Sequence, residues 1–215
     1  MTTLYSYFRS SASYRVRIAL NLKGLAYDTV PVHLLNQGGE QLLPAFAELN
    51  PHALVPVLAH EDDRMTQSLA MLEYLEERFP LPALLPGDAA RRAHIRELSL
   101  AIACEIHPLN NLRVLRYLKH QLGLDDDKKN AWIHHWIELG FAALEQQLAG
   151  DGARGSFCVG DAPTMADCCL VPQIFNARRF QVDMAPYPTL CAIEAACSAL
   201  PAFQAAHPTQ QPDAA

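Results

Sequence analysis

The feature that most constrains this fold is a change of pattern at a proline-rich segment, residues 79–87. Before it, short strand-like and helix-like stretches alternate. After it, the strand signals stop and long helical stretches follow. Clustered proline with a closing glycine is typical of a loop between folded parts. Within 215 residues we therefore predict two domains, residues 1–80 and residues 88–210.

The first domain is predicted to be α+β, in the order β-α-β-α-β-β-α of thioredoxin-like proteins. Lys23-Gly24 is a typical helix end, with a cation followed by a residue suited to the left-handed conformation. Pro31 should place the second strand at a sheet edge or end it early. Ser68 is a good N-cap for the last helix. Strands are expected at 4–8, 27–34, 55–58 and 65–67, and helices at 12–22, 44–49 and 69–78.

The second domain is predicted to be an all-α helical bundle. Thr164 followed by Asp167 fits a reciprocal capping box at the start of one helix. The last residues, 210–215, look like a frayed tail. Helices are expected at 89–122, 128–148, 164–180 and 189–200.

Composition excludes several function classes. A net charge of −6 opposes a nucleic-acid partner, which usually meets a basic surface. The N-terminus lacks the layout of a secretory signal, and no apolar run is long enough to span a membrane. We therefore expect a cytoplasmic protein without membrane contact. No cysteine pair has zinc-ligand or C-x-x-C spacing, so no metal site is expected.

The first strand-to-helix turn carries the most chemical information. It reads Ser10-Ser11-Ala12-Ser13, and the first 103 residues contain no cysteine. A helix N-terminus favours an anion such as a thiolate, and redox proteins of this topology place their own C-x-x-C there. Here the turn offers hydroxyl donors but no thiol, so the sulfur is expected from glutathione. The alternative is that Ser10 or Ser11 is only the helix N-cap.

Two further places suit a peptide ligand. If the bond between Val55 and Pro56 is cis, the backbone of Val55 turns outward and can pair with a ligand like an added strand; a trans bond is the alternative. Gln67-Ser68 opens the next helix, where a hydroxyl and free N–H groups suit a carboxylate, although a plain cap is again the alternative. Together the three places could hold the thiol, backbone and γ-glutamyl carboxylate of a tripeptide.

Five segments, residues 10–24, 50–58, 67–77, 105–115 and 160–167, together resemble a known family. Over about residues 3–205 the chain is similar to the zeta-class glutathione transferases, which include maleylacetoacetate isomerases and the related maleylpyruvate isomerases. The family motif usually reads Ser-Ser-Cys, whereas this chain has Ala12 at the cysteine position, so that cysteine is not essential if the protein is an active isomerase.

The resemblance implies a homodimer with glutathione as cofactor. It implies isomerisation of a maleyl keto acid, maleylacetoacetate or maleylpyruvate, to the fumaryl form by reversible thiolate addition, a step in aromatic-compound breakdown. Arg9, Ser10 and Ser11 would then be the catalytic residues. Glutathione would be bound by Ser11, His52, Val55, Pro56, Gln67, Ser68 and Asn110.

A dicarboxylate keto acid needs cationic partners, and the guanidinium fork grips carboxylates in a bidentate manner. Arg9, Arg113 and Arg178 are the candidate substrate-binding arginines, and His107 is a candidate for orienting the substrate. The alternatives are solvated or ion-paired arginines and a packed histidine at the Pro108 break.

Three other functions remain open. The first is a general transferase that conjugates glutathione to an electrophile. The second is a non-catalytic glutathione-binding module, against which the Ser10-Ser11 turn beside Arg9 argues. The third is a glutaredoxin-like redox enzyme, although the first strand-to-helix turn lacks the cysteine that such an enzyme uses.

Overall fold

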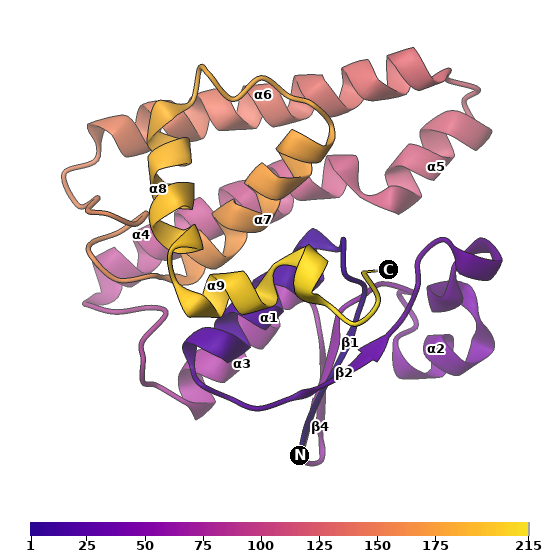
Figure 1. The fold of residues 1–215 in the computed structure, drawn as a ribbon, viewed down its shortest axis with the longest axis horizontal. Helices are drawn as coiled ribbons and strands as arrows, with labels where there is room; N and C mark the ends of the chain where they lie inside the picture. Colours follow the sequence, from indigo (N-terminus) through magenta and orange to yellow (C-terminus); the bar gives the residue numbers. More distant parts are fainter. Residues whose placement is uncertain (215) are drawn as a thin grey trace. The chain divides into compact units, whose positions relative to one another are not determined.

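The computed structural model describes residues 1–214, which form two compact units (Figure 1). One unit holds Met1–Leu84 together with the segment from Ser198 onward, and the other holds Leu85–Cys197. The sequence pattern predicts one helical domain over residues 88–210. The structure divides the chain differently, because the C-terminal segment packs with the N-terminal unit.

The N-terminal unit has the predicted order of elements. Two short 3₁₀ turns, Asn36–Gly38 and Glu40–Leu42, precede the second helix. In chain order the elements are β1 (Thr2–Ser6), α1 (Ser11–Leu22), β2 (Asp28–Pro31), α2 (Pro44–Leu49), β3 (Val57–His60), β4 (Asp63–Thr66) and α3 (Ser68–Arg78).

The four strands form one mixed sheet in the order β2-β1-β3-β4. β1 pairs in parallel with β2 and antiparallel with β3, so Leu4 lies between Thr29 and Leu58. β3 and β4 form an antiparallel hairpin. β2 lies at the sheet edge and ends at Pro31, as predicted. An edge strand tolerates proline, because its outer side needs no N–H donor.

Helices cover both faces of this sheet. α1 and α3 lie together on one side, and α2 lies on the other (Figure 1). α1 ends as predicted, with Lys23 as C-cap and Gly24 at φ 65°, a left-handed conformation that glycine adopts without steric cost. On the α2 side, Phe46 joins an apolar cluster with Tyr7, Phe8, Val32, Val55 and Val57.

Lys23 also anchors the segment after α3. Its buried Nζ donates to Glu76 Oε2 at 2.9 Å and to the carbonyls of Phe79 and Pro82 at 2.6 and 2.9 Å. The same Glu76 oxygen accepts from the Leu84 backbone N–H at 2.8 Å. A buried ion pair with this many additional hydrogen bonds is well compensated for its lost hydration.

The C-terminal segment lies beside α1 (Figure 1). It contains α9 (Pro201–Ala206) and a 3₁₀ turn, Pro208–Gln210. The Asn21 side chain donates to the Ala202 carbonyl at 3.0 Å. The Phe8 N–H donates to Asp213 at 2.9 Å. The expectation of a frayed tail is therefore wrong for residues 210–214; residue 215 lies outside the described range.

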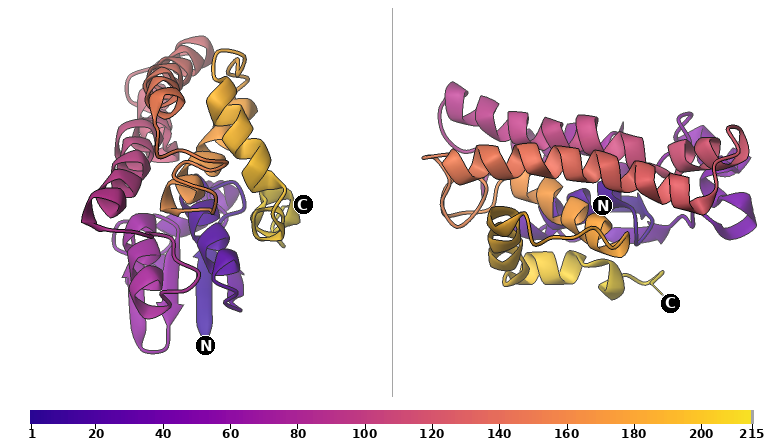
Figure 2. Two further views of the ribbon diagram at one scale, coloured as in Figure 1. Left: turned by 90° about the vertical axis from the view of Figure 1, so that its left-hand side faces the viewer. Right: turned by 90° about the horizontal axis from the view of Figure 1, so that it is seen from above.

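The second unit is helical, as predicted, and α6 runs alongside the α4–α5 stretch (Figures 1 and 2). Within residues 1–214, no helix has the length and apolar composition needed to cross a membrane. The elements are α4 (Ala89–Leu100), a π-helix (Ala101–Ile106), a 3₁₀ turn (His107–Asn110), α5 (Leu112–His120), α6 (Asp126–Gly150), α7 (Met165–Arg179) and α8 (Pro188–Ser198).

The single helix expected over 89–122 is wrong, because the π-helix and the 3₁₀ turn interrupt it. Pro108 has no N–H to donate, and its ring clashes with the preceding turn of a regular helix. Gly140 of α6 faces the interruption, and a Cβ there would overlap the Ile106 side chain. The glycine therefore permits the close approach of α6.

The predicted capping box of α7 is confirmed. Asp167 accepts from the Thr164 backbone N–H at 2.7 Å and from its hydroxyl at 2.8 Å. Its other carboxylate oxygen accepts from the Cys158 N–H at 2.8 Å. Burial raises the pKa of Asp167, and these donors oppose that effect.

An ionic cluster joins α4 to the end of α6. His94 Nε2 lies 2.6 Å from Asp151 Oδ2, and Nδ1 lies 3.0 Å from Glu97 Oε2. Burial disfavours the charged imidazolium, but the two carboxylates outweigh it and raise the pKa of His94. Burial disfavours the charged Asp151 carboxylate as well, but its hydrogen bonds prevail and lower the pKa.

Candidate glutathione site

The β1–α1 turn presents the N-terminus of α1 without any acidic side chain in its first turn. Ser10 is the N-cap, and its Oγ accepts from the Ser13 N–H at 3.2 Å. Because the oxygen is the acceptor, the Ser10 hydroxyl keeps its proton for donation. Ser11 is the first helical residue and is 5% exposed. The capping role of Ser10 and an anion-binding role for the turn are thus compatible.

Arg9 lies immediately before these serines. Its side chain is exposed, and the guanidinium carbon lies 4.8 Å from the centre of the Phe8 ring. Contact with a ring face holds a guanidinium in place without using its N–H donors. Arg9 therefore keeps its donors for a carboxylate.

The loop before β3 presents the backbone of Val55. The peptide bond from Val55 to Pro56 is cis. Val55 lies outside the strand ladder, and its N–H and C=O have no hydrogen-bond partner among residues 1–214. The Asn50 side chain shapes the loop, since it donates to the Leu54 carbonyl at 2.7 Å and accepts from the His52 N–H at 3.0 Å. The His52 side chain is exposed.

The N-terminus of α3 is the third place. The helix begins at Ser68, so Gln67 is the N-cap and the prediction that Ser68 is the cap is wrong by one residue. Gln67 has φ 70° and ψ 112° and makes no side-chain cap bond. Residues other than glycine rarely adopt such angles, and they cluster at ligand sites. With no acid in the first turn of α3, this terminus suits a carboxylate.

Arg15 joins two of these places, and the sequence analysis missed it. It lies one turn after Ser11 in α1, is 2% exposed, and its Nη1 donates to Ser68 Oγ at 3.2 Å. It brings a buried positive charge to the N-terminus of α3. The available signal was an arginine within the apolar stretch of α1, where a charged residue needs a specific partner.

The interrupted helix of the second unit carries three more predicted residues. His107 is half-buried and Arg113 is exposed. Asn110 is 7% exposed, and neither polar atom of its side chain has a hydrogen-bond partner within the described chain. Buried amides without partners are rare and indicate a missing ligand or water. π-type interruptions are also frequent at functional sites.

Arg178, near the end of α7, already has a partner. Its Nη2 lies 2.6 Å from Glu194 Oε2 and its Nε lies 3.3 Å from Glu194 Oε1, a bidentate pair at the surface. The hydrogen bonds to Glu194 raise the pKa of Arg178. This is the ion-paired alternative weighed in the sequence analysis.

The predicted residues thus fall into two groups. Arg9, Ser10, Ser11, His52, Val55, Pro56, Gln67 and Ser68 belong to the N-terminal unit, and His107, Asn110, Arg113 and Arg178 belong to the helical unit. In the first group, the contact from Arg15 to Ser68 links the N-termini of α1 and α3 directly.

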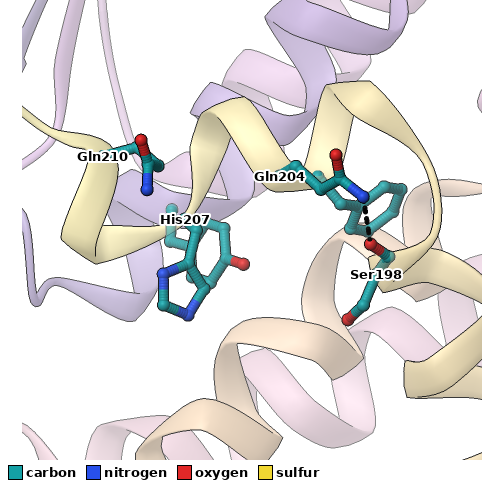
Figure 3. Close-up of a pocket in the computed structure, with 6 residues that line it drawn as sticks. Ser198, Gln204, His207 and Gln210 are labelled. Atoms are coloured by element: carbon teal, nitrogen blue, oxygen red, sulfur yellow. Dashed lines mark hydrogen bonds between the residues drawn. The ribbon is translucent and has the colours of Figure 1, made fainter.

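A cavity of about 340 Å³ in the N-terminal unit is separate from these residues (Figure 3). Burial, with help from the nearby charge of Arg17, lowers the pKa of His207 at this cavity. None of the predicted site residues lines it. Its lining is Tyr14, Ser198, Phe203, Gln204, His207 and Gln210.

Comparison with known proteins agrees with this geometry. Residues 4–83 match the glutathione S-transferase N-terminal domain and residues 131–205 the C-terminal domain. A chain with a thioredoxin-like unit and a helical unit that matches both domains belongs to the glutathione S-transferase family.

Within that family, the chain is similar to isomerases over almost its full length. It is 51% identical to a probable maleylacetoacetate isomerase of Vibrio cholerae, covering 98% of this chain and 97% of the relative. A bacterial zeta-class maleyl pyruvate isomerase structure has a TM-score of 0.96 at 50% identity, covering 99% and 100%. A maleylacetoacetate isomerase from Methylobacterium extorquens AM1, with bound malonate and glutathione, has a TM-score of 0.95 at 40% identity, covering 99% of each chain.

Proposed function

We propose that this protein is a glutathione-dependent cis–trans isomerase that converts a maleyl keto acid to its fumaryl form. The observation that carries the proposal is the β1–α1 turn. It offers a helix N-terminus and two serine hydroxyls for a thiolate, and it has no thiol of its own. The full-length similarity to isomerases that act on maleylacetoacetate or maleylpyruvate supports the substrate class.

The residues present fit glutathione. The helix N-termini of α1 and α3 lack acidic side chains in their first turns, so each suits one negative end of the tripeptide. Between them in the binding scheme, the unpartnered N–H and C=O of Val55 suit the ligand backbone. Arg15 adds a positive charge at the α3 end. We also assign His52 and Asn110 to glutathione binding, and the unpartnered amide of Asn110 supports this role.

When bound, glutathione supplies a thiolate that adds reversibly to the double bond conjugated with the ketone, which permits rotation about that bond. The chain's own contribution is electrostatic. Ser10, Ser11 and the first N–H groups of α1 stabilise the thiolate over the thiol, because they donate to an anion at a positive helix end. Ala12 carries no reactive group at the position of the family cysteine.

Arginines bind the substrate carboxylates in this proposal. The malonate bound to the Methylobacterium relative supports a dicarboxylate ligand. Arg9 and Arg113 are exposed, so both have donors for a carboxylate. To bind the substrate, the Arg178 guanidinium must leave Glu194 or bind both carboxylates at once. His107 orients the keto acid. Arg178→Ala should raise the KM for the keto acid; unchanged kinetics would leave Arg178 with a structural role only.

The test is turnover of each maleyl keto acid by the purified protein, with and without glutathione. Loss of the enol absorbance is followed, and the trans product is identified. Glutathione-dependent isomerisation of one acid supports the proposal and also identifies the substrate, because the two acids differ only beyond the ketone. Failure with both acids, while glutathione still binds, favours a conjugating transferase, which an aryl halide substrate would reveal.

We also propose that the protein is a cytoplasmic homodimer. The resemblance to zeta-class transferases supports the dimer. Light scattering on the purified full chain should give twice the mass of one 23.8 kDa chain. A single-chain mass at micromolar concentration would contradict the dimer. Fractionation of cells that produce the protein tests the cytoplasmic location.

A further inference from the structure

The turn before the two serines is held by side chains that come from elsewhere in the fold. Within the turn, the Ser10 N–H donates to the Tyr7 carbonyl at 2.9 Å. Both backbone groups of Phe8 bind charged side chains. Its N–H donates to Asp213 Oδ2 at 2.9 Å, and its C=O accepts from Arg17 Nη2 at 3.0 Å. The two peptide units that flank Phe8 are therefore fixed from outside the turn.

Arg17 connects this turn to the C-terminal segment. It is fully buried, and its Nη1 donates to Ser6 Oγ while its Nε donates to the Ala206 carbonyl, both at 3.0 Å. Burial lowers the pKa of Arg17 to about 10. The guanidinium therefore stays protonated at neutral pH, and its hydrogen bonds are charge-assisted.

Asp213 and Ala214 extend the same connection. One Asp213 oxygen accepts from Phe8, and the other is buried without a hydrogen-bond partner among the described residues. The hydrogen bonding of this carboxylate is thus directed to the turn alone. Ala214 packs against the apolar cluster that contains Phe8 and Val55. The tail therefore contacts the β1–α1 turn through Asp213 and the cluster that includes Val55 through Ala214.

We propose that Asp213 is a positioning residue of the glutathione site, which holds the peptide N–H of Phe8 and thereby directs the Ser10 and Ser11 donors at the thiolate. The inference rests on the proposed function, since glutathione must occupy this turn. Donors stabilise an anion best when their direction is fixed before the charge arrives. Without the carboxylate, the Phe8 N–H bonds to water and the turn gains other conformations.

The test uses three variants of the full chain. Asp213→Ala removes the acceptor. Asp213→Asn keeps an oxygen that accepts from Phe8 but removes the charge. Gln211→Ala is the control, because among residues 1–214 the Gln211 side chain bonds to the Ala205 and His207 carbonyls of the same tail and not to the turn. For each variant we would measure amide exchange at Phe8 without ligand, the pKa of bound glutathione by thiolate absorbance, and activity against pH.

For Asp213→Ala we expect amide exchange at Phe8 to rise about tenfold or more, as the loss of a hydrogen bond to a charged acceptor implies. The pKa of bound glutathione should rise, and turnover should fall several-fold at neutral pH and recover at high pH. Asp213→Asn should recover most of the wild-type behaviour in each measurement, and Gln211→Ala should match the wild type.

Two results would overturn the inference. Unchanged exchange at Phe8 in Asp213→Ala means that the carboxylate does not hold the turn. Faster exchange with an unchanged pKa of bound glutathione means that Asp213 is only structural. Because the exchange and thiolate readouts need no keto acid, they decide the role of Asp213 even if isomerase activity is absent. If Asp213→Ala fails to fold, Asp213→Asn takes its place, because a neutral oxygen accepts from the Phe8 N–H more weakly. Faster exchange at Phe8 together with a raised pKa of bound glutathione then supports the role, and faster exchange with an unchanged pKa refutes it.

Discussion

Replacement of Ser11 by alanine is the most direct probe of how this protein uses the thiol of glutathione. Ser11 is the first residue of α1 and is 5% exposed, so its hydroxyl lies where the helix end already favours an anion. The substitution removes one hydroxyl donor from the thiolate and leaves the Ser10 cap in place. The helix should therefore persist while the thiolate loses stabilisation.

The size of the expected rise in the pKa of bound glutathione follows from the loss of one hydrogen bond. A hydrogen bond to a charged group contributes about 1.5–3 kcal/mol. Since each pKa unit corresponds to 1.36 kcal/mol, the pKa of bound glutathione should rise by about 1–2 units in Ser11→Ala. Well below that pKa the thiolate fraction falls by about 10- to 150-fold, but a more basic thiolate is a better nucleophile, with a Brønsted coefficient of about 0.4–0.5. The net loss of turnover in that pH range is then about 3- to 20-fold.

The assay is ultraviolet titration of bound glutathione together with a pH profile of turnover. Ser11→Thr, which keeps a hydroxyl, should behave nearly as the wild type. Ser10→Ala separates helix damage from thiolate loss, because removal of an N-cap side chain costs about 0.5–2 kcal/mol of stability. We expect Ser10→Ala to show the larger fall in melting temperature and Ser11→Ala the larger shift of the thiol pKa.

The pH dependence of turnover distinguishes a loss of thiolate stabilisation from a change in binding geometry. In Ser11→Ala the deficit should shrink as pH rises and give way to a small gain once the glutathione is fully ionised, because the more basic thiolate is the better nucleophile. A deficit of the same size at every pH would refute the thiolate argument and point to altered binding geometry. An unchanged thiol pKa would remove Ser11 from the catalytic residues.

Three other predictions concern stability and are checked by chemical or thermal unfolding. Thr164→Ala should cost about 1–3 kcal/mol, because the buried carboxylate of the capping box loses a donor. Lys23→Met should cost about 3–5 kcal/mol by leaving a buried charge unpaired, and addition of Glu76→Leu should recover much of that loss, whereas no recovery would mean that the pair does not act as a unit. His94, whose pKa is raised in the fold, stabilises fully below the unfolded pKa of about 6.5 and loses this effect as pH rises through the folded pKa. The stability advantage of the wild type over His94→Gln should therefore be larger at pH 6 than at pH 9, and an equal advantage at both would contradict the role of the imidazolium.

Much of the fold was predictable because its signals are local. Helix α2 has the predicted bounds, and β2 ends at Pro31 on the sheet edge, where a residue without an N–H is tolerated. The capping box of α7 follows from two residues three positions apart. The predicted bounds 89–122 were wrong, because the apolar pattern continues through Pro108 although the backbone cannot continue there as a regular helix.

The local features of the β1–α1 turn were also predictable, since they depend on neighbouring residues: two serines, a helix start and no cysteine in the turn. The outward-facing backbone of Val55 could be anticipated only as an option, and the left-handed angles of Gln67 were not anticipated at all. The sequence also gave no means to choose between a substrate-binding and an ion-paired Arg178, because Glu194 lies on another helix.

By itself, then, the sequence determined the alternation of elements, the division into a mixed and a helical part, and the chemistry of the β1–α1 turn, because each depends on residues close together in the chain. Only the tertiary structure decided how that turn is held. Arg15 reaches Ser68, Arg17 reaches Ala206, and Asp213 reaches Phe8 across separations of 53, 189 and 205 residues. No local pattern encodes such contacts, since a buried arginine or a terminal carboxylate finds its partner only when packing brings the two segments together.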